Sequence, residues 1–591
     1  MKKLKITLLL LLAVAFLSAQ KIHPLRKLQI AEMAVSQLYV DSVDDKKLVE
    51  EAIRGMLKSL DPHSAYTTAK ETKSMNEPLT GSFDGIGVQF NMVEDTLLVI
   101  QPVRKGPSEK VGILAGDRIV SVNDTSIAGV KMDRADIMQR LRGPRGTKVK
   151  LGVNRRGVPD MLTFIVTRGK IPVHTLDAYY MLTPTVGYVR IGSFGATTYA
   201  EFMTAVDSLQ KAGMHHLVLD LQDNGGGYLQ AAVQIAGEFL KPNDLIVYTE
   251  GRAQSRHDFR ADRGGRLTKG NVYVLINEYS ASASEIVSGA IQDHDRGVLI
   301  GRRSFGKGLV QRPIEFDDGS MIRLTVAHYY TPSGRCIQKP YEKGDSEDYA
   351  LDIEKRLKRG ELYSADSIHF ADSLRYATLN MHRTVYGGGG IMPDVFVPLD
   401  TTQFTALHRQ LAARSLIINN ILRYTDNNRQ QLKERYSDFS DFVQHYQVPD
   451  ALIDSIMTQA ARQNVKPKDS LELQRTLPAL CLQLKALVAR DIWDMNEYYH
   501  VYNEQNHIVA KALQMAEAGT TLSDIRTLRT DDKSTAAHNN NGNAVAKKGK
   551  PAAAGKATKA KGKMVDKKAQ TAGKPAKSAD KHKPRKKPKK H

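Results

Sequence analysis

A short serine-rich segment offers the strongest candidate nucleophile in this chain. Residues 280–285 read Ser-Ala-Ser-Ala-Ser-Glu, and they follow an apolar run at 272–276 and open a helical pattern. A helix N-terminus supplies unpaired N–H groups and the positive end of the helix dipole, which stabilise an oxyanion. The spacing of Ser282 and Glu285 is equally typical of a capping box, in which the serine only starts the helix. The segment alone leaves both a nucleophile and a plain helix cap open.

Two glycine-rich segments supply groups that such a nucleophile needs. Residues 220–227, Asp-Leu-Gln-Asp-Asn-Gly-Gly-Gly, follow an apolar run at 217–219, and their glycines can turn N–H groups outward to bind an anion. Residues 304–311, Ser-Phe-Gly-Lys-Gly-Leu-Val-Gln, place Lys307 between two glycines beside an apolar run. Taken singly, the two segments are also typical of a glycine-rich turn and of a solvated loop lysine.

The elements around these segments alternate between strand-like and helical patterns. Apolar runs at 186–189, 217–219, 272–276 and 298–300 are separated by helical stretches, which is the rhythm of an α/β domain with a parallel sheet. The flanking regions have other periods, so we expect a multidomain α/β protein. The expected regions are 21–80 (helical), 81–169 (β-rich), 170–400 (α/β core), 401–532 (helical) and 533–591 (a disordered lysine-rich tail).

Other chemistries fit the sequence poorly. Residues 301–308 nearly match a phosphate-binding loop, but Gly308 stands where the Mg²⁺-binding hydroxyl belongs, and the next residues are strand-like and meet Pro313. His215 and His216 are adjacent and would point to opposite faces of a strand, and neither H-E-x-x-H nor G-x-S-x-G occurs. The two cysteines cannot build a metal cluster. We therefore expect no metal and no organic cofactor.

Taken together, the motifs resemble those of the carboxyl-terminal processing, or tail-specific, proteases, which are serine peptidases that carry a PDZ domain. The resemblance covers about residues 25 to 400, and the segments 220–227, 280–285 and 304–311 carry it. Further similar stretches lie at 61–64 (Asp-Pro-His-Ser), 329–335 (Tyr-Tyr-Thr-Pro-Ser-Gly-Arg) and 389–394 (Gly-Gly-Ile-Met-Pro-Asp). One departure is Gly225, where the family often has proline.

The resemblance implies a Ser–Lys dyad. By position Ser282 is the nucleophile and Lys307 the general base, while Gln311, on the same face of a strand, would orient the lysine. The N–H groups of Ala283 and Gly226 would form the oxyanion hole, with Gly227 as the alternative to Gly226. A lysine can accept the serine proton only when neutral, so an apolar wall has to lower its pKa from about 10.4 to roughly 7–8.

The β-rich region resembles the family's PDZ domain. Gly85, Ile86, Gly87 and Val88 match the loop whose N–H groups bind the terminal carboxylate of a peptide, which then adds as a strand to the edge of the sheet. Residues 107–119 and 141–147 match further stretches of that domain. The resemblance implies that this domain binds the C-termini of substrates and can gate the active site.

The charge of the chain is concentrated at its C-terminal end. The formal net charge is +21, but residues 533–591 carry 19 Lys and Arg against two acidic residues, which leaves 66 basic and 62 acidic residues elsewhere. The near-neutral body argues against a specific nucleic-acid binder, and the tail suggests contact with an anionic lipid or polysaccharide surface. Residues 1–20 have a basic start, an apolar stretch and small residues near Ser18, which predicts a signal peptide.

We therefore expect an exported serine endopeptidase of the periplasm that recognises proteins by nonpolar C-terminal tails and cleaves near that end. An uncleaved signal or the basic tail would associate it with a membrane. The alternative is a non-catalytic PDZ scaffold that binds protein C-termini and uses the tail on anionic surfaces. The helices of 401–532 suggest a homo-oligomer or an adaptor contact.

Overall fold

The computed structural model describes residues 23–400, 402 and 404–525. The predicted signal peptide at 1–20 and the predicted disordered tail at 533–591 lie outside the described residues. Within the described ranges, no helix is long and apolar enough to cross a membrane.

A mostly parallel sheet forms the centre of the α/β core, with strand order β10-β11-β12-β15-β16-β21. Only β10 runs antiparallel to its neighbour. Because parallel strands end at the same edge, the loops after β12, β15 and β16 meet there, and these loops hold the three predicted catalytic segments. The strands are β10 (Leu176–Met181), β11 (Val186–Ile191), β12 (His216–Asp220), β15 (Val272–Ile276), β16 (Val298–Gly301) and β21 (Val395–Phe396).

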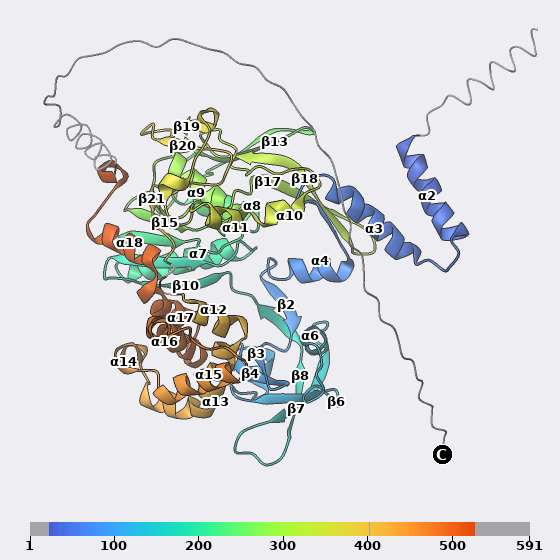
Figure 1. The fold of residues 1–591 in the computed structure, drawn as a ribbon, viewed down its shortest axis with the longest axis vertical. Coiled ribbons are helices and arrows are strands. Elements are labelled where there is room, and N and C mark those ends of the chain that lie inside the picture. Colours follow the sequence, from blue (N-terminus) through green and yellow to red (C-terminus); the bar gives the residue numbers. More distant parts are fainter. Residues whose placement is uncertain (1–22, 401, 403, 526–591) are drawn as a thin grey trace, which may run out of the picture. The chain divides into compact units, whose positions relative to one another are not determined.

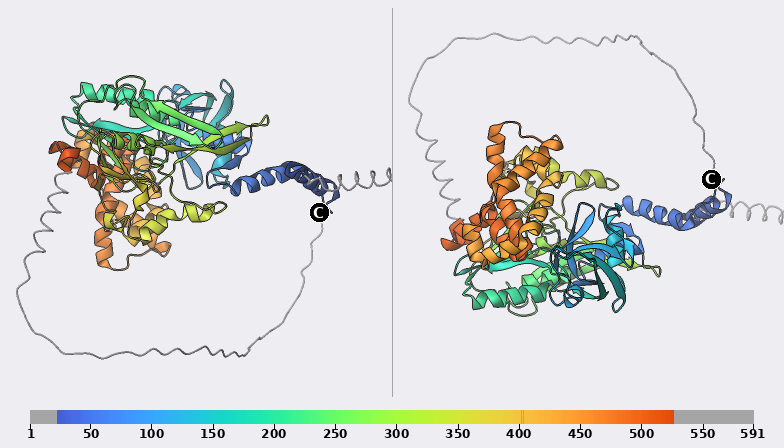
Figure 2. Two further views of the ribbon diagram at one scale, coloured as in Figure 1. Left: turned by 90° about the horizontal axis from the view of Figure 1, so that it is seen from above. Right: turned by 90° about the horizontal axis from the view of Figure 1, so that it is seen from below.

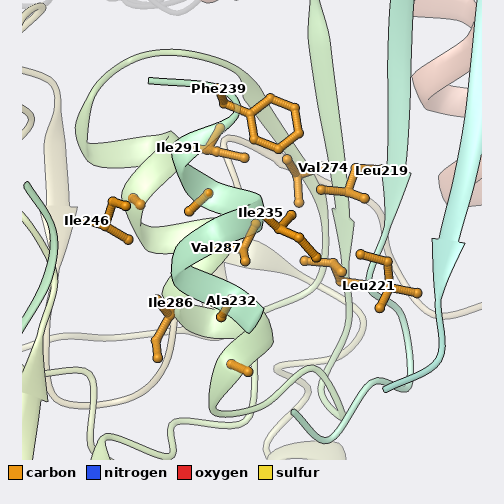
Figure 3. Close-up of a cluster of buried hydrophobic side chains, with 14 of the residues drawn as sticks. Leu219, Leu221, Ala232, Ile235, Phe239, Ile246, Val274, Ile286, Val287 and Ile291 are labelled. Atoms are coloured by element: carbon orange, nitrogen blue, oxygen red, sulfur yellow. The ribbon is translucent and has the colours of Figure 1, made fainter. Parts of the chain in front are cut away.

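Helices cover both faces of this sheet, so its inner strands β12, β15 and β16 are buried and mostly apolar. On one face lie α7 (Thr198–Lys211), α8 (Leu229–Gly237) and α9 (Ala283–Asp293). Figure 3 shows Ile235 and Phe239 near Val287 and Ile291, with Leu219 and Val274 of the strands to their right. The α/β prediction is confirmed, and α9 is a buried helix that is held rigidly behind Ser282.

A second, antiparallel sheet lies beside the first and completes the core. Its order is β1-β18-β13-β14, with β17 also paired to β18. The hairpin of β17 and β18 begins two residues after Lys307, so it places the residues that follow the lysine. The strands are β1 (Ala65–Thr67), β13 (Leu245–Gly251), β14 (Gln254–Arg260), β17 (Leu309–Glu315) and β18 (Met321–Tyr330).

The N-terminal region is helical as predicted, except that it also contributes β1 to the core. Ala65 pairs with Arg323 and Thr67 with Met321, so this region enters the core sheet as an edge strand. The sequence pattern missed β1 because three residues are too few to show a period. The helices are α2 (Pro24–Leu38), α3 (Asp45–Lys58) and α4 (Ala69–Asn76).

The β-rich region forms a separate sheet with strand order β3-β4-β5-β7-β8. A ribbon of β2 (Ser82–Gly85) and β9 (Gly169–Pro172) joins it to the core, so the predicted boundaries at 81 and 169 fall at this stem. The other elements are β3 (Val88–Val93), β4 (Thr96–Pro102), α5 (Pro107–Lys110), β5 (Arg118–Val122), β6 (Thr125–Ser126), α6 (Arg134–Leu141), β7 (Lys148–Asn154) and β8 (Leu162–Thr167).

The C-terminal helices divide into two groups with different partners. Five helices build a cluster of their own, which Figure 2 shows in orange: α12 (Ala406–Ala413), α13 (Leu416–Arg435), α14 (Phe439–His445), α15 (Asp450–Arg462) and α16 (Ser470–Ile492). α17 (Met495–Tyr502) contacts both α16 and β10. α18 (His507–Glu517) packs on the second face of the central sheet, beside β15 in Figure 1.

The remaining described elements are short, and all except one 3-10 turn lie between β18 and β21. Lys339 and Arg356 from this stretch are buried and contact the loop that carries Lys307: Arg356 donates to the carbonyl oxygens of Ser304 and Phe305. The elements are α10 (Ser346–Ala350), α11 (Asp352–Lys358), β19 (Arg375–Ala377) and β20 (Thr384–Tyr386), with single turns of 3-10 helix at Ala365–Ser367, Asp372–Leu374 and Asn503–Gln505.

Candidate active site

Ser282 lies at the start of α9, in the loop that follows β15. Its backbone has φ +56° and ψ −111°, a conformation that L-residues rarely adopt and that persists only where the surroundings enforce it. Gly226 is packed against it: a Cβ at Gly226 would lie 2.7 Å from the Cβ of Ser282 and 2.9 Å from the backbone nitrogen of Ala283. Only glycine fits there, so the predicted glycine turn and the predicted nucleophile are brought together.

Lys307 lies in the loop between β16 and β17 and faces the same cavity as Ser282. Burial, followed by the charge of Arg323, lowers the pKa of Lys307 to about 8. No hydrogen bond joins its Nζ atom to another described residue. With a pKa of about 8, roughly one lysine in ten is neutral at pH 7, and an unpartnered neutral amine can act as general base for a serine hydroxyl.

A single buried carboxylate, that of Glu285, fastens the serine to the lysine loop. One of its oxygens accepts the N–H groups of Ser282 and Lys307, both at 2.8 Å, and the other accepts Gly306 N–H at 2.7 Å and the Ser304 hydroxyl at 2.6 Å. Burial raises the pKa of Glu285 although these bonds oppose the shift. Sequence reasoning had given Glu285 only the role of a helix cap.

Tyr329 ties the same two residues through their carbonyl groups. Its hydroxyl lies 3.1 Å from the carbonyl oxygen of Ser282 and also contacts that of Lys307. The side chain is almost fully buried, and burial raises its pKa, so it stays a donor. Glu285 thus holds the N–H groups of Ser282 and Lys307, and Tyr329 holds their carbonyl groups. Together these contacts fix the position of one residue relative to the other. The sequence signal for Tyr329 was the stretch 329–335, which resembled a family motif but gave no role to the tyrosine.

Ser282 and Lys307 line a common cavity of about 550 Å³ between the two sheets of the core. Most of its wall is apolar, and its charged residues are Lys307, Glu315 and Arg323. The apolar lining residues come from α4, α8, α9 and the β17–β18 hairpin: Met75, Leu79, Leu229, Ile286, Leu309, Val310, Pro313 and Met321.

Two backbone N–H groups next to Ser282 have no hydrogen-bond acceptor among the described residues, and they belong to Ala283 and Gly227. The predicted donor Gly226 instead gives its N–H to the side-chain oxygen of Asn224 at 2.8 Å. Asn224 is buried and its own amide donates to Ile191 O at 2.7 Å, so this arrangement is firmly held. This bond favours the alternative donor, Gly227, over Gly226, and the make-up of the oxyanion hole stays a prediction. Gly226 is the close contact under Ser282.

Gln311 lines the cavity, but the strand argument that placed it there is wrong. Lys307 precedes β17, which begins at Leu309, and a bulge separates Val310 from Gln311, so strand alternation does not relate the two side chains. The amide nitrogen of Gln311 donates to Leu309 O and to the Thr325 hydroxyl, both at 3.2 Å. Its amide oxygen has no donor among the described residues, so an orienting role for Gln311 stays a prediction.

Residues 61–64, which belong to the N-terminal region, contact the part of the site around Thr325 and Gln311. Asp61 accepts hydrogen bonds from the hydroxyl groups of Ser64 (2.5 Å) and Thr325 (2.9 Å). Burial opposes ionisation of Asp61, but these bonds together lower its pKa. Burial also lowers the pKa of His63 to about 4, with the charge of Lys307 as the next cause. His63 is therefore neutral near pH 7 and bonds to the Tyr349 hydroxyl at 3.0 Å.

The predicted peptide-binding loop, Gly85 to Val88, lies where β2 turns into β3, and Gly87 has φ +74°. β3 pairs only with β4, so its other edge is open to a further strand. A small groove runs beside this edge, lined by the loop, Phe90, Met138 and Leu141. The structure thus brings the four predicted PDZ residues together at an apolar groove.

The segment 301–308 does not form a phosphate site. The residues after it form strand β17 and not a helix, so no helix N-terminus faces an anion there. His215 and His216 lie at the opposite, amino-terminal end of β12, away from the strand ends that carry Ser282. His215 and His216 do not line the catalytic cavity, whereas Lys307 of the segment 301–308 does.

Four regions of the chain match known protein families. Peptidase family S41 matches residues 185–348 and the PDZ domain matches residues 85–166. The N-terminal domain of the activating protease CtpB matches residues 15–72, and a family of unknown function matches residues 407–494.

The sequence is also similar to those of carboxy-terminal processing proteases. The carboxy-terminal processing protease CtpA of Bacillus subtilis is 38% identical over 344 residues, which cover 57% of this chain and 73% of that protein. The carboxy-terminal-processing protease of Bartonella bacilliformis is 40% identical over 305 residues, covering 51% and 69%. The solved photosystem II D1 C-terminal processing protease is 31% identical and covers 52% of this chain and 89% of its own, with a TM-score of 0.31. The chain therefore belongs to the carboxy-terminal processing proteases of peptidase family S41, as a serine-type peptidase with a PDZ domain.

Proposed function

We propose that this peptidase uses a Ser282–Lys307 dyad to cleave exported proteins near nonpolar C-terminal tails that its PDZ domain recognises. The observation that carries the proposal is the position of the two residues: both line one cavity, and Glu285 and Tyr329 hold both of their backbones. A scaffold that only bound C-termini would have no use for a buried lysine with a pKa of about 8.

The first chemical step transfers the proton of the Ser282 hydroxyl to neutral Lys307 while the serine oxygen attacks the peptide carbonyl carbon. The N–H groups of Ala283 and Gly227 then stabilise the negative charge on the carbonyl oxygen. Protonated Lys307 gives its proton to the leaving amine, and the C–N bond breaks. A water molecule, deprotonated by Lys307, hydrolyses the remaining Ser282 ester and restores both residues.

Two apolar surfaces support a preference for nonpolar tails. The wall of the catalytic cavity includes aliphatic side chains, among them Leu229, Ile286 and Val310, and the groove beside β3 is lined by Ile86, Phe90, Met138 and Leu141. A nonpolar side chain gains free energy by leaving water for such walls, whereas a charged one loses its hydration. The loop at Gly85 to Val88 would hold the terminal carboxylate of the tail.

We place the mature protein in the periplasm on the strength of residues 1–20 alone, and we assign the basic tail at 533–591 to an anionic surface on the strength of its charge. Neither segment belongs to the described residues. Removal of 533–591 would abolish salt-sensitive adsorption to anionic vesicles and leave peptide hydrolysis unchanged. Retained adsorption would contradict the role given to the tail.

The decisive experiment compares the mature protein with Ser282→Ala on an unfolded protein substrate that ends in small apolar residues. A matched substrate ends in charged residues, and mass spectrometry locates the cuts. We expect the wild type alone to cleave, with the apolar tail preferred. Lys307→Ala and Lys307→Arg should both be inactive, because arginine cannot give up its proton. Equal cleavage by wild type and Ser282→Ala would overturn the dyad.

A further inference from the structure

Arg323 is a cation without a partner in the wall of the catalytic cavity. It lies on β18, where its backbone pairs with Pro313 of β17 and Ala65 of β1, and it is half-buried. Among the described residues, no carboxylate lies within 4 Å of its guanidinium group and no hydrogen bond holds it. Several buried arginines of the core form ion pairs, such as Arg190 with Asp220 and Arg335 with Asp293, and the half-buried Arg296 donates to backbone carbonyl oxygens.

No described carboxylate makes an ion pair with Arg323. Asp61, the acid of the neighbouring loop, accepts hydrogen bonds from Ser64, His63 and Thr325. Glu315 lines the same cavity and is the diagonal neighbour of Arg323 across the hairpin, because Pro313 pairs with Arg323 and Glu315 with Met321, but Glu315 is exposed and makes no ion pair with Arg323. Arg323 and Lys307 therefore repel each other across the cavity, and this repulsion contributes to the lowered pKa of Lys307. An anion bound beside Arg323 would reduce this repulsion.

We infer that Arg323 forms an anion subsite of the catalytic cavity, where it binds a carboxylate of the substrate close to the bond that is cut. The inference rests on the proposed function. A guanidinium group binds a carboxylate through two parallel hydrogen bonds, which is the planar geometry that lysine cannot offer. A protein substrate offers two kinds of carboxylate. One is the C-terminal carboxylate, when only a short segment follows the cleaved bond. The other is an Asp or Glu side chain, when the C-terminus itself stays in the PDZ groove.

The location of Arg323 limits how far this carboxylate can lie from the scissile bond. Arg323 is near enough to shift the pKa of Lys307, and one extended residue spans about 3.3 Å. A carboxylate two to five residues from the bond is therefore within reach, at roughly 7–17 Å along the chain. The subsite would favour short leaving segments over internal sites of a long chain.

The test uses capped apolar peptides with a single cleavable bond, followed by two to five residues. One pair of peptides ends in a free acid or an amide, and a second pair ends in an amide and carries Asp or Asn at the third residue after the bond. We expect the wild type to prefer one acidic member by about 10- to 100-fold in kcat/KM, the range of a charge-assisted bidentate contact. The pair that shows the preference identifies the source of the carboxylate.

Variants separate Arg323 from the PDZ groove, which also binds a carboxylate in the proposed function. Arg323→Gln should abolish the preference and Arg323→Lys should retain part of it, whereas Met138→Glu, which blocks the PDZ groove, should leave it intact. Any change that Arg323→Gln makes to the pKa of Lys307 affects both members of a pair equally and cancels in their ratio. A preference that survives Arg323→Gln, or that disappears in Met138→Glu, overturns the inference.

The two proposals fail in different ways. If the wild type cleaves the acid and neutral members of both pairs equally, and Ser282→Ala cleaves none, the dyad stands and the anion subsite does not exist. If the wild type and Ser282→Ala cleave alike, the proposed function itself fails.

Discussion

Lys307 has to lose a proton before it can accept one from Ser282, and this sets the direction of the pH dependence. Its pKa is about 8, so the neutral fraction falls about tenfold for each unit of pH below that value. We expect kcat/KM on a peptide without titratable groups to rise with pH through 8 and then level off. Steady-state kinetics between pH 6 and 9.5 measures this, with circular dichroism to show that the fold persists. A flat profile between pH 6 and 8 would exclude Lys307 as the base.

Glu285 acts through the residues that it holds. In Glu285→Gln an NH₂ group would replace one carboxylate oxygen and would face two hydrogen-bond donors. The variant would therefore lose either the hydrogen bonds from Ser282 and Lys307 or those from Gly306 and Ser304. Misplacement by about 1 Å can cost about 10²-fold in rate, so we expect kcat to fall by that order while KM changes little.

Ser288→Ala is the matched control for this prediction, because Ser288 is also buried in α9 and donates only to Ser284 O. It should lose about 1 kcal/mol of stability and keep the wild-type kcat. If Glu285→Gln retains wild-type kcat, or if Ser288→Ala loses as much, the positioning role of Glu285 is refuted.

The sequence predicted the residue types of the site better than the bonds between them. Ser282, Lys307 and the glycine turn follow three parallel strands, and parallel strands bring such loops together whatever the details. The contacts of Glu285 with Ser304 and Gly306 depend on the path of a loop about twenty residues away, which no local pattern encodes. The choice between Gly226 and Gly227 depended in the same way on the side-chain orientation of Asn224.

At the scale of elements, short pairings between distant segments were beyond sequence reasoning. β1 has three residues, yet it pairs with β18 and brings Asp61 to Thr325, more than 250 residues away in the chain. Long elements with a clear period, such as the buried strands and α7, followed the predicted pattern. The difference is physical: burial of a whole strand leaves a pattern in the sequence, whereas a three-residue edge pairing is fixed by the surface that it meets.

The PDZ domain is docked on α13 by a small polar contact. Asp426, almost fully buried, accepts hydrogen bonds from Arg118 at 2.8 Å and Arg156 at 3.1 Å, and Val93 and Ile100 pack nearby against the helical cluster. The side chain of Arg118 is 34% exposed and that of Arg156 is 52% exposed, so each pair is worth about 0.2–1 kcal/mol and weakens in salt.

We expect Asp426→Ala to loosen this contact and to raise hydrogen–deuterium exchange in peptides covering 88–102 and 416–430, most strongly at low salt. Asp124→Ala is the control, because it removes the exposed ion pair with Lys150 elsewhere on the same domain and should leave exchange at the contact unchanged. Identical exchange in Asp426→Ala and the wild type would show that the ion pairs do not hold the domain.

At the scale of the whole chain, the predicted boundary at 400 separates the central sheet from a helix that covers it. α18 buries Ile508, Val509, Ala512 and Met515 against strands of the sheet. The Tyr273 hydroxyl also donates to Thr520 O at 2.9 Å. The peptidase core is therefore completed by α18, which follows the helical cluster α12–α16 in sequence. The cluster is thus inserted between two parts of the chain that belong to the core.

Two truncations should consequently behave in opposite ways. A chain that ends at residue 532 keeps α18 and should retain the melting temperature and peptidase activity of the full chain. A chain that ends at residue 505 exposes a face of the sheet and loses several buried side chains at about 1.5–3 kcal/mol each, a total comparable to the 5–15 kcal/mol that stabilises a typical domain. We expect it to be insoluble or unfolded by circular dichroism.

Point variants on α18 test the same prediction without shortening the chain. Val509→Asp buries a charge against the sheet and should lower the melting temperature by many degrees, whereas Gln514→Asp, on the exposed side of the same helix, should have almost no effect. A stable, active protein with Val509→Asp would mean that α18 is dispensable. The helices after 400 would then be a separate accessory domain, and the peptidase core would end where the sequence pattern first placed it.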